Sequence, residues 1–165
     1  MQTSLATRPR DAAPERVADI ETGRRVVRAE AAALEAVAEA IGEPFARAVD
    51  LIARARGRTV VTGMGKSGHV GRKIAATLAS TGTPALFVHP AEASHGDLGM
   101  IEREDVVVAL SNSGETPELR DILTYAKRFA IPLIGLVGRG ASTLGEAADV
   151  VLALPTLAEA CPLGL

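Results

Sequence analysis

Five short and almost wholly apolar runs alternate with amphipathic stretches through the last two thirds of the chain, and this alternation constrains the fold most strongly. Such runs are typical of strands that helices cover on both faces, because a strand with one wet face would alternate apolar and polar residues. The stretches between the runs are long enough for right-handed crossover helices. The sequence therefore predicts a doubly wound α/β fold with a five-stranded parallel sheet. Its strands are expected at residues 59–62, 85–88, 105–110, 133–137 and 150–154.

Helical spacing of apolar residues predicts the remaining elements. It indicates an N-terminal helix over residues 17–41, or two helices with a break at Gly23, and a further helix over 45–56 that Pro44 opens. Residues 1–14 have no periodicity and are expected to be a flexible tail, which leaves one domain over 15–165. Crossover helices are expected at residues 67–79, 117–129 and, shorter, 143–148.

Composition limits the partners of the chain. A length of 165 residues with 47% hydrophobic residues suits one compact domain. A net charge of -2 and only 2% aromatic residues argue against nucleic acid, which requires a basic field or stacking platforms. The sequence contains no apolar run long enough to span a bilayer and no signal-peptide pattern, so we expect a cytoplasmic protein. The single cysteine, Cys161, cannot form an internal disulfide.

A glycine-rich turn follows the first predicted strand, where residues 63–69 read Gly-Met-Gly-Lys-Ser-Gly-His. At the N-terminus of the next helix, such a turn offers an anion site of phosphate size. Gly65-Lys66-Ser67 resembles the end of a nucleotide P-loop, but that motif also needs a glycine five residues before Gly65. The residue there is Val60, so the P-loop interpretation fails.

The same glycines have the G-x-G-x-x-G spacing of a dinucleotide turn. That fold places an acid at the end of the second strand, where this chain reads His89-Pro90-Ala91, with Glu92 beyond the proline. A nicotinamide enzyme is therefore disfavoured. A merely structural strand-to-helix turn explains the glycines but leaves Lys66 unexplained.

A second polar loop follows the third predicted strand and reads Ser-Asn-Ser-Gly-Glu-Thr over residues 111–116. Its three hydroxyls, beside a helix N-terminus, would hold a phosphate monoester well. The alternative is that Ser113 or Thr116 only caps the helix at Pro117. Because one cap needs one hydroxyl, the cluster favours phosphate binding. Ligands of doubly wound folds bind beyond the carboxyl ends of the strands, where both loops are expected.

At these residues the chain resembles the sugar isomerase (SIS) domain family, whose phosphosugar site has Ser-x-Ser-Gly-x-Thr after the third strand and a serine in the first turn. Further motifs at residues 80–84, 88–93, 95–99 and 159–162 make it similar to the arabinose-5-phosphate isomerases from about Glu30 onward. The resemblance implies a flavodoxin-like strand order and a tetramer. It also implies substrate binding by Gly65, Ser67, Ser111, Ser113 and Thr116.

This family interconverts D-ribulose 5-phosphate and D-arabinose 5-phosphate for the Kdo sugar of lipopolysaccharide. Moving a carbonyl between C1 and C2 requires a base and a group that stabilises the enediolate, and no redox cofactor. Lys66 suits the enediolate, whereas Glu118 or Glu159, as a partly desolvated carboxylate, suits the base. The resemblance implicates all three residues.

The resemblance also favours an active-site role for His95, which could polarise the sugar, open its ring form or approach a neighbouring subunit's site. His69 and His89 are expected to be structural. The scattered histidines and Cys161 lack the ligand spacing of a dedicated metal site, so no cofactor is expected. A divalent ion such as zinc would bind them as an inhibitor.

The chain ends at Leu165, shortly after the 159–162 motif. The family continues into a further helix, a segment with another histidine and often a CBS pair. We therefore expect a SIS domain that is incomplete at its C-terminal end, with the isomerase fold and weak or no turnover. Two other classes stay open, an isomerase for another phosphosugar and a non-catalytic or regulatory sugar-phosphate-binding module. A homo-oligomer is expected in either case.

Overall fold

The structure, a computed structural model, describes residues 13–156 and residue 160. The described residues fall into two units, one that contains residues 13–39 and one that contains residues 40–156, and each is described by itself. In the first unit, helix α1 (Ala13–Ala40) is continuous through Gly23. The long N-terminal helix is thus a single element, and it begins two residues inside the predicted tail. The rest of that tail lies outside the described residues.

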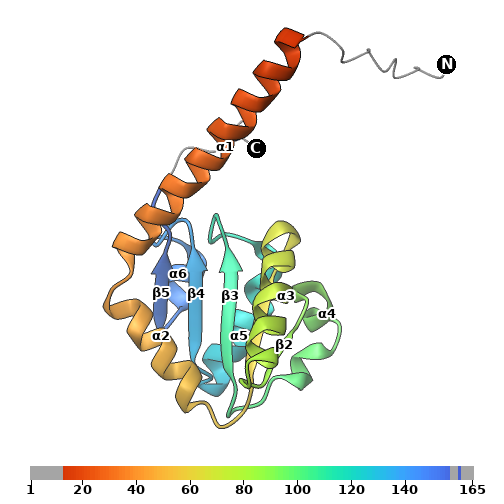
Figure 1. The fold of residues 1–165 in the computed structure, drawn as a ribbon. Coiled ribbons are helices and arrows are strands. Elements are labelled where there is room, and N and C mark those ends of the chain that lie inside the picture. Colours follow the sequence, from red (N-terminus) through yellow and green to blue (C-terminus); the bar gives the residue numbers. More distant parts are fainter. Residues whose placement is uncertain (1–12, 157–159, 161–165) are drawn as a thin grey trace, which may run out of the picture. The chain divides into compact units, whose positions relative to one another are not determined.

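The second unit is a five-stranded parallel sheet with helices on both faces (Figure 1). The strands are β1 (Thr59–Gly63), β2 (Ala85–Phe87), β3 (Val106–Ser111), β4 (Leu133–Val137) and β5 (Val150–Ala153). The α-helices are α2 (Glu43–Arg54), α3 (Gly65–Ser80), α4 (Pro90–Ser94), α5 (Arg120–Phe129) and α6 (Thr143–Ala147). Two single turns of 3-10 helix, η1 (Asp97–Met100) and η2 (Pro117–Leu119), complete the described elements.

The strand order is β2-β1-β3-β4-β5, which confirms the predicted doubly wound fold and its flavodoxin-like order. The chain passes from β1 outward to the edge strand β2, then returns to β3 and continues the other way through β4 to β5. The order therefore reverses between β1 and β3, where Gly63 pairs with Leu110. In doubly wound folds this reversal, at the carboxyl ends, is where ligands bind.

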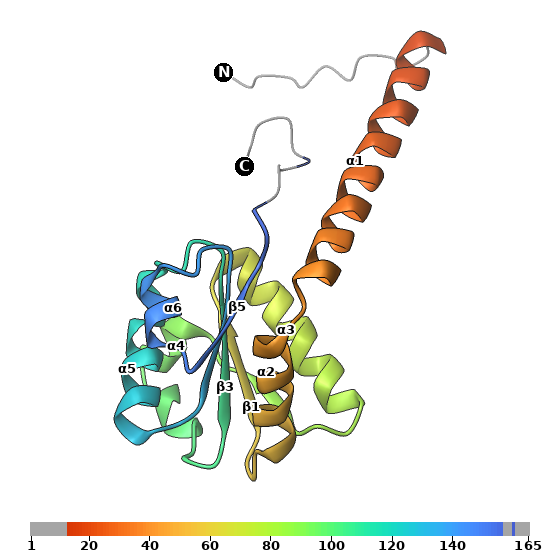
Figure 2. The ribbon, with the colours of Figure 1, turned by 90° about the vertical axis from the view of Figure 1, so that its left-hand side faces the viewer.

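Helices α2 and α3 cover one face of the sheet, and α4, α5 and α6 cover the other (Figure 2). On the first face Val61 and Ile134 pack with Ala48 of α2 and Ala75 of α3. On the second face the core includes residues from three strands and three helices, namely Val60, Val107, Leu133, Ala93, Ile122 and Leu144. Because both faces are covered, β1 and β3 are buried along their whole length, as their apolar sequences predict.

Apart from shifts of one or two residues at the ends of elements, the structure of the second unit differs from the prediction in two places. Residues 90–94 and 97–100, where no element was predicted, form α4 and η1, which are too short to show a helical period in the sequence. The helix predicted over 117–129 is divided into η2 and α5. The first turn is a tight 3-10 turn, in which the Leu119 N–H donates to the Thr116 carbonyl at 3.2 Å. Pro117 fits at its start, because the first N–H of a helix has no intrahelical partner.

Candidate functional site

Each glycine of the turn between β1 and α3 has a backbone reason to be there. A Cβ atom on Gly68 would lie 2.6 Å from the carbonyl oxygen of Gly63, so only glycine lets α3 approach β1 this closely. Gly65 has φ of 55°, in the left-handed region that disfavours other residues. These contacts account for the spacing that resembles a dinucleotide turn. They do not account for Lys66 and Ser67.

Lys66 and Ser67 lie in the first turn of α3, immediately beyond the carboxyl end of β1. The first N–H groups of a helix have no intrahelical partner and form the positive end of its dipole. No acidic residue lies in this first turn, so no carboxylate there offsets the positive potential. An ammonium group, a hydroxyl and a helix N-terminus therefore come together at one place.

The loop over residues 111–116 closes on itself through its own hydroxyls. The Ser111 and Thr116 hydroxyls share a hydrogen bond of 2.7 Å, and the Gly114 N–H donates to Ser111 Oγ at 3.0 Å. The Glu115 N–H donates to Ser113 Oγ at 3.1 Å. Thr116 is the N-cap residue of η2, but its side chain makes no capping hydrogen bond. Helix capping, the alternative explanation of these hydroxyls, is thus not what they do here.

A hollow of about 220 Å³ opens at the carboxyl ends of the strands, beside both loops. Its polar lining consists of Lys66 and Ser67 from the first loop and Ser111 and Asn112 from the second. Apolar residues from α3 and the ends of β3, β4 and β5 form the rest, among them Val70, Leu110, Leu136 and Leu154. The structure thus brings three of the predicted site residues to one cavity.

Asn112 is a candidate that the sequence reasoning did not single out, although it stands between the two serines of the Ser-x-Ser pattern. Its exposed side chain offers both a donor and acceptors to a sugar hydroxyl. Three other predicted binding residues, Gly65, Ser113 and Thr116, belong to the same two loops but do not line this hollow. Thr116 lines a smaller one of about 80 Å³, between η2 and α6.

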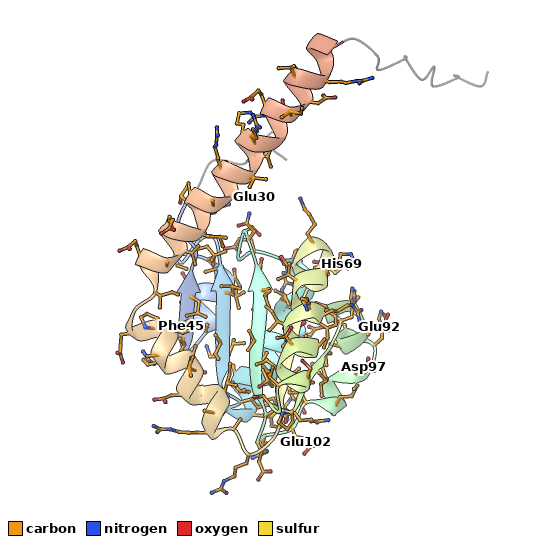
Figure 3. All side chains as sticks on the ribbon, viewed as in Figure 1. Glu30, Phe45, His69, Glu92, Asp97 and Glu102 are labelled. Atoms are coloured by element: carbon orange, nitrogen blue, oxygen red, sulfur yellow. The ribbon has the colours of Figure 1, made fainter. Side chains whose placement is uncertain are left out.

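The predicted acid–base residues lie away from the hollow or outside the described residues. Glu118, in η2, is exposed, so the partial desolvation expected of a catalytic base is not present at this residue. Helix α4 packs against η2, and His95 follows α4 directly, also exposed. In Figure 3, the labels of Glu92 and His69 mark α4 and α3, which lie on opposite faces of the sheet. Glu159 lies outside the described residues.

The N-terminus of α6 supports the 111–116 loop from behind. The Glu115 carboxylate accepts hydrogen bonds from the Thr143 N–H at 2.9 Å and from its hydroxyl at 2.6 Å. The Leu144 N–H donates to the Gly114 carbonyl at 3.0 Å. The hydrogen bond from the Thr143 side chain, then that from its backbone, lowers the pKa of the Glu115 carboxyl, with a smaller contribution from the positive charge of Arg139.

A larger hollow, of about 470 Å³, lies at the opposite end of the sheet, near the first residues of β3 and β5. It is less suited to an anion than the hollow at the carboxyl ends. Its four arginines are matched by four carboxylates, namely Asp50, Glu104, Asp105 and Asp149. We therefore place the candidate site at the carboxyl ends, where a lysine and a helix N-terminus meet.

Two other kinds of site are absent from the described part of the chain. Among residues 13–156 and 160, no group of three or more His, Cys, Asp or Glu side chains could hold a metal ion. Over the same residues, no helix has the length and apolar character needed to cross a membrane.

Fold and site together define a class of protein. A SIS domain model matches residues 51–164, which include both loops and every strand, and the chain belongs to the SIS domain family. Among curated relatives, it is 53% identical to the arabinose 5-phosphate isomerase KdsD of Pseudomonas aeruginosa, over 88% of this chain and 45% of the relative. The chain therefore spans less than half the length of the curated relatives that it matches.

Solved structures agree with this family. A protein of E. coli CFT073, solved in complex with arabinose 5-phosphate, is 40% identical with a TM-score of 0.80, over 90% of this chain and 79% of that one. A Listeria monocytogenes protein described as a putative sugar-phosphate isomerase is 28% identical with a TM-score of 0.86, over 90% of this chain and 78% of that one.

Proposed function

We propose that this chain provides the sugar-phosphate site of an aldose–ketose isomerase that interconverts D-arabinose 5-phosphate and D-ribulose 5-phosphate through an enediolate. The observation that carries the proposal is the shared hollow at the strand-order reversal, which Lys66 and Ser67 line from one side and Ser111 and Asn112 from the other. Relatives named for this reaction, and the E. coli structure that holds arabinose 5-phosphate, support the choice of sugar.

In the proposed reaction the phosphate binds between the N-terminus of α3 and the hydroxyls of the 111–116 loop. Free N–H groups at a helix N-terminus and serine hydroxyls together satisfy its oxygens. A carboxylate, Glu118 or Glu159, takes the proton from C2 of the aldose and returns it to C1. A second proton passes from the C2 hydroxyl to the C1 oxygen through the enediolate, so the carbonyl moves to C2. The Lys66 ammonium stabilises the negative oxygen of the enediolate, and His95 assists at the sugar.

Substitution of Lys66 tests this proposal. We expect Lys66→Ala to lower the rate of isomerisation by about 100-fold, the usual cost of one lost enediolate-stabilising group, with little loss of sugar-phosphate affinity. Deuterium incorporation at C2 of arabinose 5-phosphate in D₂O measures proton abstraction, and NMR titration measures binding. Lys73→Ala is the matched control, because Lys73 is an exposed lysine further along α3. Two results together would identify a binding module instead. The wild type would show no deuterium exchange at C2, and Lys66→Ala would bind the sugar phosphate more weakly.

We further propose that the protein is a cytoplasmic homo-oligomer in which a second copy covers part of α1. Four large apolar side chains of α1 are 54–71% exposed, namely Val17, Ile20, Val27 and Leu34. They recur at intervals of three and seven residues, which aligns them along one side of the helix, as in helices that pair with other helices. Exposure of an apolar stripe of this length to water is unfavourable in free energy, so the stripe favours association with another chain.

A further inference from the structure

Glu115 is the one charged residue of the 111–116 loop, and its carboxylate bonds to the first residue of α6. Its two oxygens accept from the backbone and the hydroxyl of Thr143, 28 positions away in the sequence. Both contacts are charge-assisted and short, which makes them the strong kind of hydrogen bond. Glu115 thus joins the 111–116 loop to the N-terminus of α6.

Further contacts join the 111–116 loop to residues 138–145 and leave the two segments little freedom to move independently. The Gly138 N–H donates to the Asn112 carbonyl at 3.0 Å. Gly114, with φ of 71°, packs so tightly on Ser142 that an added Cβ atom would overlap its hydroxyl. In turn, Ser142 Oγ donates to the Arg139 carbonyl at 2.8 Å and accepts from the Gly145 N–H at 3.3 Å. The 111–116 loop is therefore held from behind by a rigid turn.

A carboxylate in this loop is unexpected if its charge alone is considered. A negative group beside a phosphate site repels the ligand, so removal of the charge by itself would strengthen phosphate binding. The contacts with Thr143 give the opposite expectation, since loss of the anchor frees the loop and raises the entropy cost of ordering its hydroxyls around the ligand. The two effects have opposite signs and can be separated by experiment.

We propose that Glu115 is a positioning residue for phosphate, which holds the Ser111, Ser113 and Thr116 hydroxyls in place by bonding to Thr143. This inference rests on the proposed function, because it takes the ligand to be a sugar phosphate. Glu115 itself faces α6 and does not line the hollow that contains Lys66 and Ser67. Its effect is therefore on affinity rather than on proton transfer.

The test measures binding of inorganic phosphate and of arabinose 5-phosphate to the full chain by NMR titration. We expect Glu115→Ala to weaken both about tenfold, the equivalent of one hydrogen bond of ordinary strength. Glu115→Gln, whose amide still bonds to Thr143, should stay within about threefold of wild type. Glu146→Ala is the matched control, because it removes another exposed acid from the first turn of α6, and we expect its affinity to be unchanged.

Affinity equal to or tighter than wild type in Glu115→Ala would show that only the charge matters and would overturn the proposal. Equal weakening in Glu146→Ala would also overturn it. Should Glu115→Ala not fold, Thr143→Val removes only the hydroxyl contact, and we expect about threefold weaker binding than in Thr143→Ser. Unchanged binding in Thr143→Val would then count against the anchor. A wild type that binds both ligands without isomerising the sugar contradicts the proposed function alone.

Discussion

At the scale of single residues, the 63–69 and 111–116 loops contain some residues that the fold requires and others that it does not. Gly63, Gly65 and Gly68 are explained by close packing and a left-handed φ, whereas Lys66 beside them has no structural explanation. Ser111 is buried and closes its loop, but it also lines the hollow. The residues that the fold does not require are therefore the better candidates for chemistry.

The lowered pKa of Glu115 predicts a pH-dependent contribution to stability. The unfolded carboxyl has the higher pKa, so it binds a proton first as the pH falls, and the folded state then loses its advantage. We expect wild type to be more stable than Glu115→Gln above the usual carboxyl pKa. The difference should diminish as the pH falls towards the folded pKa and vanish below it. Urea unfolding followed by circular dichroism from pH 7 to pH 3 measures it.

Thr143→Val provides the control for this pH dependence, because it removes the side-chain hydrogen bond that is the largest cause of the shift. With valine at position 143, the pKa of the Glu115 carboxyl should lie closer to its unfolded value. The stability difference between Glu115 and the Glu115→Gln variant should then change less with pH than it does when Thr143 is present. An equal pH dependence with and without the Thr143 hydroxyl contradicts the assigned cause.

At the scale of elements, the site depends on how closely α3 packs against β1. The helix begins two residues after the strand ends, so its N-terminus lies beyond the carboxyl end of β1, near the 111–116 loop. Gly68 permits this approach, and Gly71 lets Phe87 of β2 pack against the same side of α3. Because the turn is short, a small shift of α3 would move Lys66 and Ser67 together.

Gly68→Ala tests this packing. Its Cβ atom would meet the Gly63 carbonyl at 2.6 Å, so we expect a loss of about 1–3 kcal/mol in the free energy of unfolding, despite the higher helix propensity of alanine. Gly99→Ala is the control, since no atom lies within 4 Å of the added Cβ, and we expect a change within about 0.5 kcal/mol. Urea denaturation measures both variants. Equal stability of the two would argue against a close helix–strand contact.

At the scale of the whole molecule, the two units differ in how much they bury. Residues 40–156 form a core on each face of the sheet, whereas α1 contains no fully buried side chain among those described. Isolated helices are only marginally stable in water, and most helical stability in proteins comes from packing. A helix of 28 residues with an exposed apolar stripe is therefore expected to pack against another chain.

The prediction at this scale concerns assembly. We expect wild type to sediment as an oligomer, and the double substitution Val27→Asp with Leu34→Asp to shift it towards the monomer, because two charges cannot be buried in an apolar contact. Ala32→Asp adds the same acid to another side of α1 and should leave the assembly unchanged. Sedimentation equilibrium distinguishes these outcomes. If the wild type is a monomer at micromolar concentration, the proposal of a homo-oligomer is wrong.

Local pattern was sufficient to predict most of the fold. Strands β1 and β4 were expected within one residue of their observed bounds, since buried strands must be apolar and flanking glycines and prolines delimit them. The sequence also predicted that the two polar loops belong to one site, because parallel strands place their carboxyl ends at one edge. Short elements such as α4 were not predicted, because five residues are too few to show a helical repeat of apolar residues.

By itself, then, the sequence determined the fold class, the strands and the two loops, because these follow from local composition and spacing. Only the tertiary structure decided which side chains meet. Asn112 joins Lys66 at the hollow, Glu115 bonds to Thr143, and the buried Asp105 accepts from the Arg58 N–H, 47 positions away. Such contacts depend on strand order and on close packing between distant segments, which no local period encodes.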